Sequence, residues 1–245
     1  MTRLVSIVLF LALWQIGARL LGPHYLPEPV AVAGAMIAEA RSGELAFNLG
    51  MTLARVLASF SLAMVLGSAL GVALGRLPRL DRLVDPWVVI LLNIPALVVI
   101  MFAYIWGGLN EVSALAAIAL NKLPNAVVTL REGARALDPA LDEMAQVFAF
   151  SRARRWRHVV APQLAPFFAA AARSGLALVW KIALVVELLG RPNGVGFKMN
   201  EAFQLFDLKI LLAYALPFVA LMMLVESFVL RPAEQAASWW RRNGA

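Results

Sequence analysis

Long apolar segments alternate with short polar ones along the whole chain. Six of these runs are long and apolar enough to approach the width of a bilayer. They cover residues 4–21, 52–75, 86–106, 112–130, 165–189 and 208–230. The pattern predicts an all-α, polytopic membrane protein with six transmembrane helices in a single domain over residues 1–245, and it excludes an ordinary soluble domain.

Two of the runs carry residues that modify a uniform apolar helix. Small residues recur in the second run at four-residue intervals: Ser59, Ala63, Gly67, Gly71 and Gly75. This spacing predicts a face on which another helix packs closely. In the third run, Asn93 and Pro95 predict a kink or an unwound turn, whose freed backbone groups need partners and could line a pathway.

The ends of the chain are predicted to attach it to the membrane. Residues 4–21 are expected to be an uncleaved anchor, because the nearest small-x-small site, at residues 31–33, lies well beyond the run. Residues 22–50 are expected to be external, with a short surface helix over residues 31–40. The tail, Trp239-Trp240-Arg241-Arg242, is typical of an anchor at a membrane interface.

Composition agrees with this topology. The chain is 62% hydrophobic and 15% charged, and its net charge of +7 comes from basic residues dispersed among short loops. Thirteen of the 22 lysines and arginines fall on the side of the two termini and four on the other, which predicts cytoplasmic termini and no nucleic-acid partner. The absence of cysteine excludes disulfides, and two histidines, His24 and His158, do not make a zinc site.

The longest polar segment between runs, residues 138–162, predicts two short helices. Asp138 is a candidate N-cap for the first, with Pro139 at the first helical position. Leu141, Met144, Ala145 and Phe148 recur at helical spacing, so one face is built for burial. Ser151 can cap a second, arginine-rich helix, which is expected to end near Pro162.

This segment resembles the cytoplasmic Glu-Ala-Ala loop of ABC-importer permeases. The positions that align with the family pattern are Glu143-Met144-Ala145, Ala149, Val159 and Pro162. Met144, Ala149 and Ala161 depart from the family pattern, which has Ala, Gly and Leu there. If the family glycine supplies a left-handed turn, Ala149 costs about 1 kcal/mol at that position or shifts the turn.

Further landmarks are similar to the permeases of the nitrate, sulfonate and taurine subgroup. They are Thr52-Leu53 with Arg55, the glycines at 67, 71 and 75, Asn93-Ile94-Pro95, Trp106-Gly107-Gly108-Leu109, Ser174-Gly175-Leu176, Trp180, Glu187, and Gly194-Val195-Gly196. The resemblance implies a fold like that of type I ABC importers in a bacterial inner membrane. It also implies a second permease copy, most simply a homodimer, two cytoplasmic ATPase subunits that use ATP and Mg²⁺, and an external solute-binding protein.

Energy for transport is expected to come from outside this chain. No segment reads G-x-x-x-x-G-K-[ST], so the chain is expected to bind no cofactor and to be a transport subunit rather than an enzyme. The resemblance assigns ATPase coupling to the loop over residues 131–164. The residues expected to carry it are Leu141, Glu143, Met144, Ala145, Phe148, Ala149, Arg152 and Pro162. The alternative for this loop is an amphipathic helix lying on anionic lipid.

Charges within the runs are the candidates for a translocation pathway, since an ionisable group in hydrocarbon usually faces a cavity or a partner. Lys181 follows Trp180 and could present a cation and an aromatic face to a small anion or a planar solute. The alternatives are an ion pair between Lys181 and Glu226, or a lysine that reaches for water. Asn93, Pro95 and Glu187 complete the candidate pathway, with Glu187 more typical of a structural or gating contact.

The expected function is therefore import of a small solute, with a nitrate-, sulfonate- or taurine-like anion favoured and an aromatic vitamin precursor as the alternative within the family. Two other classes stay open. A secondary transporter would use the intramembrane charges as an ion relay. A membrane scaffold would use the polar loop only to recruit a soluble protein.

Overall fold

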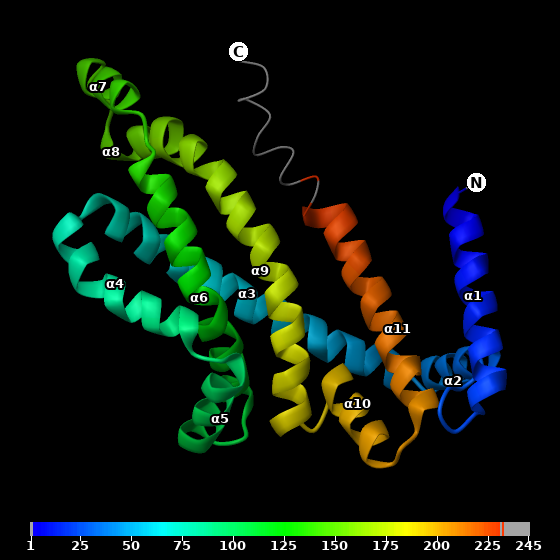
Figure 1. Cartoon of the computed structure of the whole chain (residues 1–245). Coiled ribbons are helices and arrows are strands. Elements are labelled where there is room, and N and C mark those ends of the chain that lie inside the picture. The colour runs from blue at the N-terminus through cyan, green and yellow to red at the C-terminus, as the bar shows by residue number, and fades with distance from the viewer. Residues whose placement is uncertain (1, 231, 233–245) are drawn as a thin grey trace. The chain divides into compact units, whose positions relative to one another are not determined.

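Helices follow one another along the chain, as the apolar runs predict. The structure is a computed structural model that describes residues 2–230 and 232, and no strand occurs among them. Its α-helices are α1 (Thr2–Leu21), α2 (Pro29–Arg41), α3 (Glu44–Arg76), α4 (Pro78–Asn93), α5 (Ala96–Gly107), α6 (Glu111–Arg135), α7 (Pro139–Val147), α8 (Arg152–Arg155), α9 (Ala161–Gly190), α10 (Val195–Gln204) and α11 (Leu208–Val225) (Figure 1). Two π-helical turns, Trp156–Val160 and Glu226–Leu230, adjoin α9 and α11.

Four helical segments are long and apolar enough to cross a membrane. They are Glu44–Arg76, Glu111–Arg135, Arg152–Gly190 and Leu208–Phe228. α4 and α5 together form a fifth candidate, bent by 100°. Val5–Leu21 is apolar but shorter. By length and composition the described residues thus contain four or five spans, and the sixth, expected at residues 4–21, stays a prediction.

The break between α4 and α5 falls where the sequence predicts it. α4 ends at Asn93, Ile94 is extended, and α5 begins after Pro95. A residue that precedes proline is held in extended geometry by the proline ring, which stops the helix there. The Asn93 amide donates to the carbonyl oxygen of Val89 (2.8 Å) and so satisfies one acceptor at the helix end.

The prediction that the arginine-rich helix ends near Pro162 is wrong. α8, the turn Trp156–Val160 and α9 form one continuous helical segment, Arg152–Gly190. In the π-helical turn the Ala161 amide donates to the Trp156 carbonyl, five residues back, in place of the usual four. Pro162 lies directly after this wider turn, where the regular i→i−4 bonding that a proline interrupts is already replaced.

The chain divides into two compact units, and the expected single domain over residues 1–245 stays a prediction. The second unit contains Arg55–Ala183 and Met222–Ala245. Its core joins α3, α6 and α9 through Met64, Ala126, Leu130 and Ala171. A second cluster joins α3, α4 and α6 through Leu74, Val88 and Val127.

The small residues of α3 let α6 approach closely, as the four-residue spacing predicts. A side-chain carbon added at Gly67 would lie 2.6 Å from the Ala126 side chain. The same carbon at Gly75 would lie 2.6 Å from the Ala134 side chain. Helix packing therefore accounts for these glycines.

The first unit contains Met1–Ala54 and Leu184–Leu221. The expected external helix is α2, and α3 begins at Glu44, earlier than residue 52. The Trp14 indole donates to the Pro27 carbonyl (3.0 Å) and ties α1 to the segment that follows it. The predicted tail anchor, residues 239–242, lies outside the described residues.

Candidate functional site

α7 begins as its sequence predicts. The carboxylate of Asp138 accepts from the Ala140 amide (2.8 Å), and Pro139 occupies the first helical position. Both features satisfy or remove amide donors that the first turn of a helix leaves unpaired. The start of α7 is therefore determined locally.

Most of the apolar face of α7 is not covered by this chain. Ala145 is 1% exposed, whereas Leu141 and Met144 are each 38% exposed and Phe148 is 69% exposed. Of the four predicted face residues, the chain itself buries only Ala145. The other three leave an apolar surface that a separate molecule can cover.

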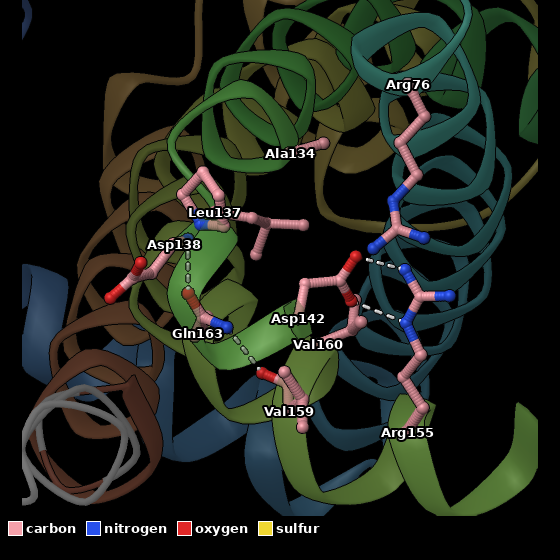
Figure 2. A pocket seen from close by; sticks show the side chains of 10 residues that line it. Arg76, Ala134, Leu137, Asp138, Asp142, Arg155, Val159, Val160 and Gln163 are labelled. Atoms are coloured by element: carbon pink, nitrogen blue, oxygen red, sulfur yellow. Dashed lines mark hydrogen bonds and ion pairs between the residues drawn. The ribbon is translucent and has the colours of Figure 1, made fainter. Parts of the chain in front are cut away.

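A neighbouring side of α7 is tied to the helical segment that leads into α9. Both carboxylate oxygens of Asp142 accept from the Arg155 guanidinium, and the Nε bond measures 2.5 Å. Such a two-point pair constrains orientation as well as distance. Figure 2 shows this pair beside a cavity of about 370 Å³, which Arg76, Leu137 and Val160 also line.

Gln163 forms a second tie between the two helical segments. Its carbonyl oxygen accepts from the Asp138 amide (2.9 Å), and its own amide donates to the Val159 carbonyl (2.9 Å) (Figure 2). The Asp142–Arg155 and Gln163 contacts together hold α7 against the start of α9. Sequence reasoning missed both ties, because neither spacing follows a local motif.

Ala149 adopts the left-handed backbone that the resemblance anticipates. Its φ is 49°, and the Phe150 amide donates to the Ala145 carbonyl (2.9 Å) while the Ala149 amide donates to that of Gln146 (2.9 Å). This pair of bonds is the Schellman pattern, which normally places glycine at the left-handed position. The turn has therefore not shifted, and alanine carries the strain.

The remaining predicted coupling residues lie on the surface. Glu143, Arg152 and Pro162 are exposed. Among the described residues Glu143 takes part in no ion pair, so its carboxylate is available to a partner. The structure thus brings Glu143 together with the exposed apolar residues on one short helix.

Of the three predicted pathway residues of α9, Trp180 and Glu187 are buried and Lys181 is exposed. Trp180 is 2% exposed, whereas Lys181 is exposed. Consecutive helix residues point in directions about 100° apart, so the single chain does not present the indole and the ammonium on one surface. The possible Lys181–Glu226 ion pair is not among the contacts of the described residues. Asn93 and Pro95, at the break between α4 and α5, are also exposed.

Lys122 is a buried cation within α6. It is 0% exposed, and its ammonium donates to the carbonyl oxygen of Ala171 in α9 (3.0 Å). Gly175 makes room for it, because a side-chain carbon at that position would lie 1.9 Å from the lysine Cε. The resemblance includes Ser174-Gly175-Leu176, and this contact supplies a physical reason for the glycine.

Glu187, in the first unit, is the centre of a buried polar network. It is 0% exposed, and its carboxylate accepts from the Thr52 hydroxyl (2.8 Å) and the Gly196 amide (2.9 Å). Thr52 in turn accepts from the Val195 amide (2.8 Å). The Asn48 side chain accepts from the Gly194 amide (2.8 Å). The first amides of α10 thus meet an anion and two polar side chains, as a helix N-terminus favours.

The two glycines of Gly194-Val195-Gly196 are required by this network. Gly194 has φ of 107°, and a side-chain carbon there would lie 2.3 Å from the carboxyl carbon of Glu187. At Gly196 it would lie 2.2 Å from the Leu184 carbonyl oxygen. Residues far apart in the chain are therefore brought into one contact set, in which the role of Asn48 was not predicted.

Comparison with known proteins identifies a family and several relatives of this chain. Residues 63–231 match the family described as binding-protein-dependent transport system inner membrane component. A putative aliphatic sulfonates transport permease of Bacillus subtilis is 29% identical, over 99% of this chain and 88% of its own length. The taurine transport system permease of Escherichia coli is 23% identical, over 95% and 86%. A riboflavin transport system permease of Chloroflexus aurantiacus is 31% identical, over 83% and 76%.

A solved structure has a related fold. A chain of the MetNI methionine ABC transporter, in an inward-facing conformation, superposes with a TM-score of 0.65 at 18% identity. The superposition covers 76% of this chain and 92% of that one. This protein is therefore a helical membrane permease. It belongs to the family of binding-protein-dependent transport system inner membrane components, which are permease subunits of ABC transporters.

Proposed function

We propose that this chain is the membrane-spanning subunit of an ATP-driven importer, and that α7 receives the motion of a cytoplasmic ATPase. The observation that carries the proposal is the two-sided character of α7. Leu141, Met144 and Phe148 are exposed on it beside Glu143, while Asp142 and Ala145 fix it to the chain. ATP and Mg²⁺ belong to the partner, and this chain supplies the docking surface.

The ties behind α7 explain how a push on it reaches the membrane. Asp142 and the backbone amide of Asp138 connect α7 to Arg155 and Gln163, and the helical segment that contains these two residues continues through α9 to Gly190. A short helix held at two points moves with the segment to which it is held. In alternating access, rotation of the ATPase subunits would thus be transmitted to the span that contains Lys181.

Lys181 supports a pathway between two permease copies. An ammonium at membrane depth is costly in lipid, so an exposed lysine within a span favours a cavity or a protein interface. We propose a homodimer in which the two α9 helices and the two α4–α5 breaks, at Asn93 and Pro95, border the pathway. Trp180 supports Lys181 from within, and the Glu187 network holds the α9–α10 connection at the outer end.

A small anion is the proposed solute, since the exposed pathway charge is a cation. The sulfonate and taurine permeases among the relatives agree with this class. The riboflavin permease keeps an aromatic vitamin as the alternative. An external solute-binding protein would deliver the solute, and both termini would lie in the cytoplasm of a bacterial inner membrane.

Co-purification tests the coupling role. Membranes that express the tagged wild-type chain are solubilised in mild detergent, and the co-purifying ATPase is quantified against Glu143→Arg. The matched control is Glu28→Arg, which makes the same charge change at an exposed glutamate in the first unit. The proposal expects the ATPase to be retained by the wild type and the control and lost from Glu143→Arg.

Two results would overturn this function. Recovery of the chain without any ATPase, under conditions that keep a permease dimer intact, would favour a gradient-driven transporter. Retention of the ATPase without any ATP-dependent solute uptake in proteoliposomes would favour a scaffold.

A further inference from the structure

The first turns of α4 have two faces of opposite character. At helical spacing, acidic and β-branched residues fall on one side and basic and large apolar residues on the other. The inner set is Asp81, Val84, Asp85 and Val88, and the outer set is Arg79, Arg82, Leu83 and Trp87. The inner face packs on α6, with Val88 3% exposed in the cluster that joins it to Leu74 and Val127.

The acids of α4 are neutralised by α6. Arg131 contacts Asp81 (3.1 Å) and Asp85 (2.5 Å), and Arg135 contacts Asp81 (2.6 Å). These carboxylates therefore cannot balance the arginines of their own helix. On the inner face, the negative charge of the segment is neutralised by arginines of α6.

The outer face keeps its positive charge. Arg79 and Arg82 are exposed, and within residues 2–230 neither has an ion-pair partner. Leu83 is 71% exposed and Trp87 is 65% exposed on the same side. An arginine pair followed by a leucine and a tryptophan is the combination that favours a membrane interface with anionic lipid.

This face follows directly on the end of an apolar span. α3 ends at Arg76, and α4 begins two residues later at Pro78. Arginines next to the end of an apolar span favour the headgroup region of a bilayer. Trp87 lies eight residues beyond Arg79, about 12 Å along the helix, and tryptophan favours the same interface.

A second permease copy is a poorer occupant of the first turns of this face. A two-fold contact uses the same surface on both copies, so it would bring two arginine pairs into one interface, while the carboxylates of these turns are already paired with α6. We propose that the outer face of α4 binds the headgroup of an anionic phospholipid. Arg79 and Arg82 hold the phosphate, while Leu83 and Trp87 contact the start of the acyl chains. Binding of lipid here does not depend on which solute is transported.

Quenching of Trp87 by brominated lipids tests this site. The purified full-length chain is reconstituted into phosphatidylcholine vesicles that contain phosphatidylglycerol, with bromine on one lipid or the other at equal mole fraction. Because the chain has seven tryptophans, the Trp87 signal is the difference between the wild type and Trp87→Phe. The expected preference for the anionic lipid is about fivefold for each arginine, at about 1 kcal/mol per charge near the surface.

The variant Arg79→Gln/Arg82→Gln should lose this preference while Trp87 is still quenched. The control is Arg19→Gln/Arg41→Gln, which removes two exposed arginines from α1 and α2 and should leave the preference unchanged. Equal quenching by both brominated lipids in the wild type would overturn the proposal. Quenching by neither lipid would show that protein covers the face, and this result would also overturn the proposal. So would a preference for the anionic lipid that survives in the double variant, because other residues would then be responsible for it.

Discussion

A side-chain carbon on Gly71 would lie 2.5 Å from the backbone carbonyl oxygen of Val127, so these two residues fix the distance between α3 and α6. The contact is with backbone, which cannot rotate away as a side chain can. The core of the second unit depends on this close approach.

Gly71→Ala should therefore push α3 and α6 apart. We expect a loss of about 1–3 kcal/mol in stability, typical of overpacking, measured as a lower thermal midpoint of the detergent-solubilised chain. Gly50→Ala is the control in the same helix, since nothing lies within 4 Å of a carbon added there. An unchanged midpoint for Gly71→Ala would contradict the packing described here.

Ala149→Gly should stabilise the turn after α7. A left-handed backbone, here with φ of 49°, destabilises a residue that has a Cβ atom by about 1 kcal/mol relative to glycine. We expect slower proteolysis at the 148–151 turn and an unaltered association with the ATPase. Ala140→Gly, within α7, should be cleaved faster, because glycine lowers helix stability there. Faster cleavage of Ala149→Gly would contradict the claim that the backbone at Ala149 is strained.

Glu187→Gln should loosen the α9–α10 connection. The NH2 group of glutamine would replace an oxygen that accepts from the Thr52 hydroxyl and the Gly196 amide. A buried NH2 group that faces other donors has no acceptor, which lowers stability by about 1–3 kcal/mol. Hydrogen exchange of the Val195 and Gly196 amides should rise by about tenfold or more. Combining the variant with Thr52→Val tests coupling, since additive effects of the two changes would argue against a shared network.

Lys181→Glu should abolish uptake of an anionic solute, since it reverses the charge proposed for the pathway. Lys181→Arg keeps the charge and should retain much of the transport. Uptake into proteoliposomes with the ATPase and the solute-binding protein measures both, and ATPase co-purification should be equal for the two variants. Normal anion uptake by Lys181→Glu would remove this lysine from the pathway.

Local patterns sufficed for much of the fold. The Asp138 cap and the break at Asn93 and Pro95 depend on neighbours within a few turns, and each has the predicted form. The α3 glycines pack closely, as their spacing predicts, and the apolar runs give four or five of the six expected spans. Pro162 is the exception. A proline tends to end a helix, but this segment continues through Pro162 after a π-helical turn, and other helices of the chain continue through Pro124 and Pro217.

The sequence by itself determined the helical class, the membrane character and the position of the polar loop, because hydrophobicity and helix periodicity are properties of short windows. Tertiary structure alone decided that Arg155 and not a partner holds Asp142, that Trp180 is buried while Lys181 is exposed, and that Asn48, Thr52 and Glu187 meet the start of α10. Such contacts join residues up to 146 positions apart, and no local spacing encodes which distant partner a polar side chain finds.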